Sequence, residues 1–497
     1  MSSIHFPVII QLLLLATAVS IPIMRKKFDS IMKIFVVMSS LVAWILSVFT
    51  MANVFRNGAF LYNFGNWTQK IGVQHLIDEF SSTMACVIMT IATLIIIYSV
   101  KDVEHEVKQG QMGNYYTLVF LLLYSMVGMT YTNDVFNMYV FMEILSLTSC
   151  AIISARREKE TFLAAFRYLM LNTIGSLSVL IGVGMLYMVT GYLNMMEMSK
   201  VIAQVWQSYP INILVSLGFV ITGLGIKAAL FPLHIWLPDA HSSAPTPSSA
   251  LLSGLVVKVY IFCAAKILFR IIGQSIIVAL GVPTYISVFA ALGMIMGSVF
   301  AIGQKDIKRL LAYSSVAQLG YIFLGFGLAT HQGFAASLFH IVSHALMKTG
   351  LFLSAGAIIY NKGKRDIREF DGIGYEMPIT MGVFTISVLG MIGIPGINGF
   401  MSKMYLSFAV LEADKPFYIL VILASSFLNA IYYLPIVISA FLKESKERKN
   451  VMILDKLPKS MLIPMVIIAA SCVIMGIFPQ LIMNTMEKVA PTFLTLY

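Results

Sequence analysis

The hydrophobic residues of this chain form long runs that are separated by short polar segments. Runs long enough to cross a hydrocarbon core of about 30 Å recur along the whole sequence. No polar or low-complexity stretch between them is long enough to form a soluble domain. The pattern predicts an all-α polytopic membrane protein with about fourteen transmembrane helices. The predicted spans are 4-24, 31-52, 77-100, 114-131, 134-154, 162-189, 211-231, 247-269, 280-302, 307-329, 334-360, 378-411, 417-441 and 461-483.

Two stretches contain residues that break helices. The first apolar segment reaches Lys227 and is interrupted at Pro232; in the second, Pro395 and Gly396 interrupt the run, and Lys403 follows them. A proline removes a backbone donor, and the carbonyl that it frees is tolerated in a bilayer only where protein or water satisfies it. Two broken helices at corresponding places in two halves are typical of transporters built from inverted repeats.

These breaks predict a division of the chain into four parts. Residues 1-113 supply three transmembrane helices and an outer loop, and residues 442-497 supply an inner loop and the last transmembrane helix. Between them, 114-269 and 280-441 are expected to form the two inverted repeats.

Composition and charge agree with a membrane location. Of the 497 residues, 59% are hydrophobic and 11% are charged, and the mean hydropathy is +0.86. The net charge of +11 does not indicate nucleic-acid binding, because the basic residues lie in short loops between apolar runs. Cytoplasmic loops are enriched in lysine and arginine, so this bias predicts that both termini lie on the outer side of a cell membrane. Trp67, in a long outer loop, suits a membrane interface. The segments predicted to face inside are 25-33, 101-108, 156-159, 305-309, 362-368 and 443-459.

Ionisable residues within the predicted spans are the main functional signal. A charged side chain at the centre of a membrane costs roughly 2.5–3.5 kcal/mol, so it normally faces protein or water and marks an ion path. Residues 340, 344 and 348 recur every four positions, which places them on one helical face. Histidine, with a pKa of about 6.5, is suited to proton transfer. The row predicts a proton relay of Glu143, Lys227, Lys258, His340, His344 and Lys403, with Lys348 as a secondary candidate.

Each of these residues also has a structural alternative. Glu143 and Lys227 are consistent with an ion pair between helices, and Lys258 with a bond to a backbone carbonyl that joins two helices. Lys348, if it lies near a helix end, would extend to the membrane surface. The two histidines have the spacing of a helical metal site, but no glutamate lies between them and no cysteine is near, so no metal is predicted.

Longer motifs resemble one family of membrane proteins. The matching segments are NFGNWTQKIGVQHLID (63-78), NDVFNMYVFMEIL (133-145), FRYLMLNTIGS (166-176), KAALFPLHIWLPDAHSSAPTPSSALLSGLVVK (227-258), GQKDIKRLLAYSSVAQLGY (303-321), FHIVSHALMKTGLF (339-352) and GIPGINGFMSK (393-403). Through them the chain resembles the antiporter-like subunits shared by Mrp-type cation/proton antiporters, respiratory complex I and energy-converting membrane-bound hydrogenases. It looks most like the D subunit of Mrp antiporters and its hydrogenase-type equivalent.

This resemblance implies two inverted five-helix repeats, each with a half-channel from one side of the membrane. In the family's pattern Glu143 and Lys227 are the coupling pair of the first half. Lys258 and the histidines form the central relay, and Lys403 is the terminal lysine of the second half. The secondary candidates in the HIWLPDAH motif are His234, Asp239 and His241.

The expected function is proton translocation by one subunit of a larger complex, coupled to a redox module or to sodium exchange. The chain has no dinucleotide motif, P-loop, haem or iron–sulfur ligand set, so we expect no cofactor and no redox catalysis of its own. Expected partners are similar antiporter-like membrane subunits and a peripheral iron–sulfur redox module. Two alternatives stay open: a sodium-translocating subunit with carbonyl ligands at the breaks, and a scaffold without an ion path.

Overall fold

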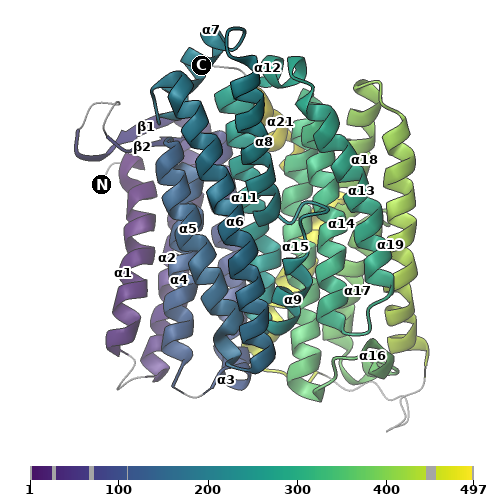
Figure 1. Ribbon diagram of the computed structural model, residues 1–497. Coiled ribbons are helices and arrows are strands. Elements are labelled where there is room, and N and C mark those ends of the chain that lie inside the picture. Colours follow the sequence, from purple (N-terminus) through teal and green to yellow (C-terminus); the bar gives the residue numbers. More distant parts are fainter. Residues whose placement is uncertain (1–2, 25–28, 67–71, 109, 444–454, 495–497) are drawn as a thin grey trace.

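The computed structural model describes residues 3–24, 29–66, 72–108, 110–443 and 455–494. Its long helices stand side by side in one bundle, and a short hairpin lies at one end (Figure 1). The strands are β1 (Phe60–Asn63) and β2 (Gln74–Ile77). The helices are α1 (Phe6–Met24), α2 (Asp29–Asn57), α3 (Glu79–Glu106), α4 (Met112–Tyr131), α5 (Val135–Ile153), α6 (Lys159–Thr190), α7 (Met195–Val205), α8 (Pro210–Lys227), α9 (Trp236–Ser243), α10 (Thr246–Leu251), the π-helix η4 (Leu252–Val256), α11 (Val257–Ala265), the π-helix η5 (Lys266–Ile272), α12 (Gln274–Ala279), α13 (Val282–Ile302), α14 (Ile307–Leu328), α15 (His331–Lys362), α16 (Ile373–Glu376), α17 (Pro378–Ile392), α18 (Asn398–Glu412), α19 (Phe417–Leu442), α20 (Lys459–Ile477) and α21 (Gln480–Leu494).

The long apolar helices coincide with predicted spans. Among the described residues, 12 helices are long and apolar enough to cross a membrane. The other two predicted spans fall on composite elements. Span 247-269 covers α10, η4, α11 and η5, which follow one another without a loop, and span 378-411 covers α17 and α18. The all-α polytopic membrane class is therefore confirmed, whereas the count of fourteen spans stays a prediction.

Several short elements differ from the predicted pattern. The expected outer loop contains the antiparallel pair β1 and β2, and Trp67 lies outside the described residues. The prediction for 461-483 is wrong at its end, because α20 stops at Ile477 and a separate helix, α21, begins after Pro479. Proline ends α20 because it cannot donate the next backbone hydrogen bond. Short strands and helices contain too few residues to show a clear period, which explains why the sequence pattern does not reveal them.

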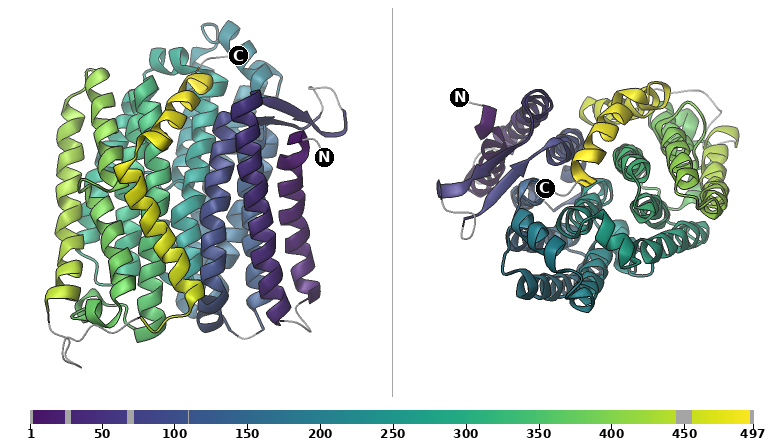
Figure 2. Two further views of the ribbon diagram at one scale, coloured as in Figure 1. Left: turned by 180° about the vertical axis from the view of Figure 1, so that it is seen from behind. Right: turned by 90° about the horizontal axis from the view of Figure 1, so that it is seen from above.

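The centre of the bundle is α15, the helix that carries both predicted relay histidines. All residues in the most apolar 18-residue stretch of α15 are buried. In the corresponding stretch of α14, 94% of the residues are buried. For α2 and α19 the buried share is only 33%, so these helices present most of their surface to lipid or to other subunits. Figure 2 shows the helices from behind and along the bundle axis. The central part of α15, with the titratable side chains of His340, His344 and Lys348, is therefore enclosed by protein.

The two ends of the bundle differ in charge. The first residues of α1 and the last of α21 lie toward one end (Figure 1). The opposite end carries Lys101, Arg156, Lys305 and Arg365, and we call it the basic end. Residues 25-28 and 444-454, which are parts of the predicted inner segments 25-33 and 443-459, lie outside the described residues.

Two basic residues at the ends of predicted spans are buried in the bundle. Lys308, in the segment 305-309 that is predicted to face inside, is in the first turn of α14 with its side chain fully buried. Arg270, which follows the predicted span 247-269, is 6% exposed and forms an ion pair with Asp78 just before α3. Burial tends to raise the pKa of Asp78, but the guanidinium of Arg270 and the hydrogen bonds from Ser81 outweigh it and lower that pKa. A charge count along the sequence does not separate such buried charges from exposed loop charges.

At the second helix break, the close contact between α17 and α18 depends on glycine. A Cβ atom built on Gly399, in the first turn of α18, would lie 1.8 Å from the carbonyl oxygen of Gly390 in α17. No side chain fits at that distance, so α18 can start there only with glycine. Gly382, on the same helix as Gly390, has no atom within 4 Å of the corresponding Cβ position.

We expect Gly399→Ala to destabilise the protein by about 3 kcal/mol or more, because backbone atoms would have to move to accommodate the methyl group. The thermal unfolding midpoint and the yield of assembled complex would both fall. Gly382→Ala is the matched control and should leave both unchanged. Equal stability of the two variants would mean that α17 and α18 do not cross as closely as described.

Candidate functional site

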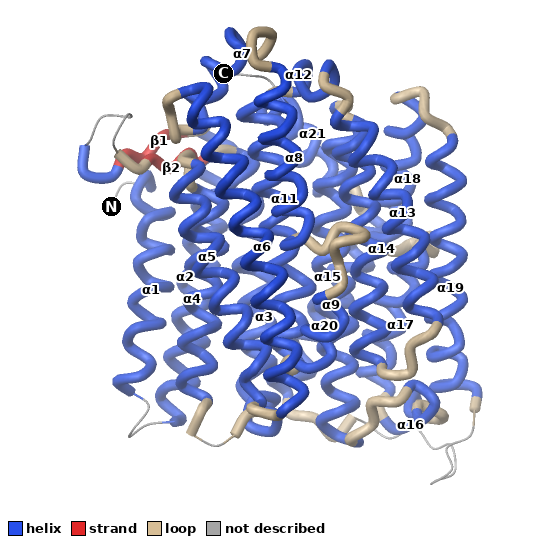
Figure 3. The backbone as a smooth tube through the Cα atoms, in the orientation of Figure 1, coloured by secondary structure: helices blue, strands red, loops and turns tan. Residues whose placement is uncertain are grey.

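The first helix break places Lys227 beside Glu143. Lys227 is the last residue of α8, and the chain continues through an irregular loop inside the bundle before α9 begins (Figure 3). Its Nζ lies 3.9 Å from Oε1 of Glu143 and donates a hydrogen bond of 2.6 Å to Oγ of Ser146. The phenol group of Tyr260, on α11, lies 3.2 Å from the Ser146 hydroxyl. The predicted pairing of Glu143 with Lys227 is thus present.

The two members of this pair differ in exposure. The side chain of Lys227 is fully buried, whereas that of Glu143 is 32% exposed. Because Glu143 is at the middle of α5, its exposed part is on the lateral surface of the bundle. A carboxylate in that position is costly when it faces lipid and is more stable when it faces another protein or water.

Lys258 lies just after the π-helix η4. Its side chain is fully buried, and Nζ donates a hydrogen bond to the carbonyl oxygen of Ser253, one turn earlier. The acceptor belongs to the same continuous helix, so the alternative that Lys258 joins two helices through this carbonyl is wrong. The hydroxyl of Ser253 in turn contacts that of Ser315 on α14 at 2.9 Å. π-Helical turns of this kind often occur at functional sites.

Three buried titratable residues of α15, His340, His344 and Lys348, follow one another along the helix. The rings of His340 and His344 are nearly parallel, with centroids 6.0 Å apart. Nδ1 of His340 lies 2.9 Å from the hydroxyl of Ser402. Lys348 is fully buried near the middle of the helix, and its Nζ donates to the carbonyl of Leu311 at 2.7 Å. The alternative in which Lys348 extends to the membrane surface is therefore wrong.

Lys403 occupies the second helix break. Its Nζ donates hydrogen bonds to the carbonyl oxygens of Met391 and Ile392, at 2.8 and 2.9 Å, and to the hydroxyl of Ser426 at 2.9 Å. The two carbonyls are the last of α17, and a helix C-terminus attracts positive charge. The first break shows a related arrangement, because Lys227 is itself at the C-terminal end of α8. Each break thus combines a helix C-terminus with a lysine.

Several buried polar atoms around α15 have no hydrogen-bond partner among the described residues. Such atoms are rare in proteins, and most are hydrogen-bonded either to protein or to ordered water. A group of them at one site, in a polar surrounding, is suited to hold a chain of water molecules. They include both ring nitrogens of His344, Nε2 of His340, both amide atoms of Gln318 and the hydroxyl of Ser343.

The secondary candidates of the HIWLPDAH motif lie in different surroundings. His241 is fully buried, has no partner for either ring nitrogen among the described residues, and interacts electrostatically with Lys348 and Lys258. It therefore extends the row. His234 is instead stacked on aromatic rings, and Asp239 forms ion pairs with two arginines at the basic end, so neither joins the row.

Several buried titratable residues are missing from the sequence-based set, among them Lys266, Lys308 and Asp102. Lys266 donates to the carbonyls of Thr130 and Thr132 at 2.5 and 2.8 Å, and its position inside a long apolar run could have revealed it. Lys308 and Asp102 lie at the ends of predicted spans, where charges are common, so no sequence signal marks them. Among the described residues, no group of three or more His, Cys, Asp or Glu side chains is arranged to hold a metal ion.

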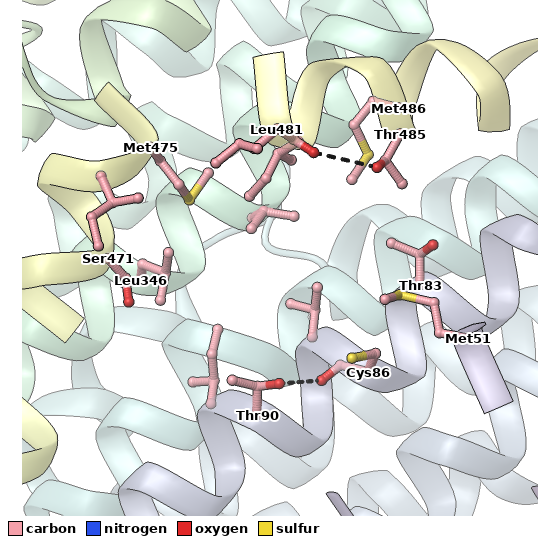
Figure 4. Close-up of a pocket in the computed structure, with 15 residues that line it drawn as sticks. Met51, Thr83, Cys86, Thr90, Leu346, Ser471, Met475, Leu481, Thr485 and Met486 are labelled. Atoms are coloured by element: carbon pink, nitrogen blue, oxygen red, sulfur yellow. Dashed lines mark hydrogen bonds between the residues drawn. The ribbon is translucent and has the colours of Figure 1, made fainter. Parts of the chain in front are cut away.

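A separate cavity of about 400 Å³ lies between α3, α15, α20 and α21 (Figure 4). Its lining is mainly aliphatic and includes Leu346, Met475 and Met486. One of the hydroxyls that the figure shows there is engaged within its own helix: Thr90 donates to the carbonyl of Cys86 at 2.7 Å. The described residues that line this cavity include no lysine, histidine or carboxylate, so it is not part of the titratable row.

Comparisons with known proteins show the family of the chain. Residues 132–429 match the family described as NADH:quinone oxidoreductase/Mrp antiporter, transmembrane. The chain is 34% identical to the N subunit of the NADH-quinone oxidoreductase of Desulforudis audaxviator, over 98% of this chain and 99% of that protein. It is 28% identical to the D subunit of the Na(+)/H(+) antiporter of Alkalihalophilus pseudofirmus, over 90% and 89%. A chain of the membrane-bound sulfane sulfur reductase, an archaeal respiratory membrane complex, superimposes with a TM-score of 0.90 at 28% identity, covering 99% of this chain and 98% of that one.

Proposed function

Because the chain belongs to the NADH:quinone oxidoreductase/Mrp antiporter family of membrane subunits, we propose that it conducts protons along its buried titratable row. The row runs from Glu143 and Lys227 through Lys258 and the residues of α15 to Lys403. The observation that carries the proposal is the group of unpartnered polar atoms around His344, because these atoms require hydrogen bonds that water can supply. Water and histidine together can pass protons between the fixed lysines.

Glu143 and Lys227 act as the switch of this mechanism. While they are close, the carboxylate and the ammonium group stabilise each other's charge. Separating them removes that support, so Lys227 releases its proton more readily toward Lys258 and the histidines of α15. The work of separation comes from partner subunits, through a redox reaction or through the gradient of a second ion.

Protons suit this row better than sodium does. Sodium binds to oxygen atoms, and carbonyls at a broken helix are the usual source of them. Here the last carbonyls of α17, Met391 and Ile392, already accept hydrogen bonds from the ammonium group of Lys403. A resident sodium ion would have to displace that positive charge.

The surroundings of the row support assembly into a larger complex. The relatives include subunits of NADH-quinone oxidoreductase and Na(+)/H(+) antiporter complexes. We propose that a similar antiporter-like membrane subunit covers the exposed part of Glu143. The basic end faces the cytoplasm, as the lysine and arginine bias favours, and both termini lie outside a cell membrane. The proposal keeps 114-269 and 280-441 as inverted repeats and assigns redox cofactors to partner subunits.

Glu143→Gln tests this function. Glutamine keeps the size of the side chain but removes the charge that stabilises Lys227, so we expect proton movement to fall about a hundredfold. The complex is reconstituted into vesicles, driven by its own reaction, and followed with a pH-sensitive dye after assembly is verified. Glu197→Gln, which alters an ion pair on α7, is the matched control and should be unaffected. Normal proton movement in an assembled Glu143→Gln complex contradicts the proposal.

A further inference from the structure

A second group of buried charges lies at the basic end, apart from the proposed row. Asp102 and Glu106 are on the last turns of α3, Arg156 follows α5, and Lys308 is in the first turn of α14. Asp102 and Lys308 are fully buried, and the side chain of Glu106 is 5% exposed. Burying this many charges is expensive, so their presence calls for an explanation beyond packing.

The hydrogen-bond partners of Glu106 explain why its charge can be buried. Its carboxylate accepts a hydrogen bond of 3.0 Å from Nε of Arg156. It also accepts bonds of 3.0 Å from the backbone N–H and 2.6 Å from the hydroxyl of Thr246. These bonds hold the start of α10 against α3. Glu106 is therefore a fixed, compensated anion.

Asp102 lies one turn earlier on α3 and is held differently. Both of its carboxylate oxygens are buried and without a hydrogen bond to any described residue. Arg156 and Lys308 are close enough to interact electrostatically, as is Glu106, but none of them bonds to it. The neighbouring phenols have other partners. Tyr98 bonds to the carbonyl of Leu353 at 2.9 Å, Tyr115 contacts the hydroxyl of Ser248 at 3.1 Å, and Tyr116 contacts the hydroxyl of Ser99 at 3.2 Å. Within the described part of the chain, Asp102 thus has no structural bond to maintain.

Lys308 connects this group to the proposed row. Its Nζ donates a hydrogen bond of 2.5 Å to the carbonyl of Ala244, just after α9. On that helix, His241 interacts electrostatically with both Lys308 and Lys348. The order Asp102, Lys308, His241, Lys348 therefore runs from the basic end to the centre of α15.

Solvent reaches the edge of this group. A hollow of about 490 Å³ at the basic end is lined by Arg156, Ser242, Asp306 and Arg365, among others. Arg156 is the residue that holds Glu106, and Ser242 directly follows His241. Arg365 donates a hydrogen bond of 2.8 Å to the carbonyl of Ser242 and so holds the end of α9 at the hollow. The lining of the hollow therefore includes Arg156, which interacts electrostatically with Asp102, and Ser242, the residue after His241.

We propose that Asp102 is the proton acceptor through which the row is filled from the basic end. Its carboxylate takes a proton from water in the hollow and becomes a carboxylic acid. It then gives that proton to the neutral amine of Lys308, which becomes an ammonium group, and the imidazole of His241 takes it onward to Lys348. The inference rests on the proposed function. It adds a residue from α3, a helix outside both expected repeats.

The test compares Asp102→Asn with Asp102→Glu in the assembled, reconstituted complex. Asparagine has the same shape but cannot carry a proton, so we expect proton movement to fall at least about tenfold. Glutamate restores a carboxyl group and should recover most of it. Asp366→Asn removes a surface carboxylate at the same end, where Asp366 pairs with Arg368, and serves as the matched control.

Three results would overturn the inference. One is normal proton movement with Asp102→Asn in a preparation in which Glu143→Gln abolishes it; the proposed function would then stand without this entry site. Another is loss of movement in Asp102→Glu as well as Asp102→Asn, which would indicate a requirement for shape. The third is failure of Asp102→Asn to assemble, which would make the carboxylate structural. If Glu143→Gln and Asp102→Asn both leave proton movement intact, the proposed function fails too.

Discussion

Replacement of Lys403 by methionine is expected to reduce proton movement about a hundredfold, the loss typical of removing a positioned proton donor. Methionine has a similar unbranched side chain but carries no proton. Lys403 is 7% exposed, and its ammonium group has three oxygen acceptors at the break between α17 and α18. It is the last titratable residue of the row, so without it the row would have no group at this break that can carry a proton. Proton movement is measured in vesicles that contain the assembled complex.

A surface lysine provides the control for this experiment. Lys200, on α7, is 51% exposed and pairs with Glu197, so Lys200→Met removes the same charge without touching the row. Its proton movement should equal that of the unmodified complex. An assembled Lys403→Met complex that still moves protons at the normal rate would exclude Lys403 from the pathway.

Lys258→Met is expected to separate function from stability. Proton movement should again fall about a hundredfold, whereas the thermal unfolding midpoint should stay the same or rise. The reason for the second effect is that Lys258 is fully buried and its described hydrogen bond is to its own helix. Replacing a buried charge by an apolar residue of similar volume is often neutral or stabilising.

Lys258→Arg distinguishes a proton carrier from a fixed positive charge. Arginine keeps the charge but does not release its proton under physiological conditions. If the row conducts protons, this variant should be as inactive as Lys258→Met. Activity in Lys258→Arg, or a fall in the unfolding midpoint of Lys258→Met, would indicate that Lys258 has an electrostatic or structural role only.

Much of the fold and of the row could be predicted from the sequence because membranes impose simple rules. A segment that crosses lipid must be apolar over its whole length, so its position is visible in the pattern. A charge inside such a segment is equally visible, which is why Glu143, Lys258 and Lys403 could be identified. The breaks at Pro232 and Pro395 were visible because proline and glycine interrupt an apolar run.

The remainder depends on tertiary contacts that leave no such pattern. Lys308 and Asp102 lie at the ends of apolar runs, where a charge normally reaches water. They are buried only because α3 packs against α10 and α14 packs against α9. Lys348 could be placed on the right helical face, but the sequence does not show that its ammonium group bonds to the carbonyl of Leu311 in α14. The hairpin of β1 and β2 is too short to show an alternating pattern.

The most direct test follows pH and sodium separately inside the same vesicles, for the unmodified complex and for Lys403→Met. The central claim is that this chain itself conducts protons along its buried row. It predicts that the unmodified complex moves protons and that the assembled variant does not, whatever happens to sodium. Unchanged proton movement in the variant, or loss of sodium movement alone, would contradict the claim and assign the ion path to another ion or another subunit.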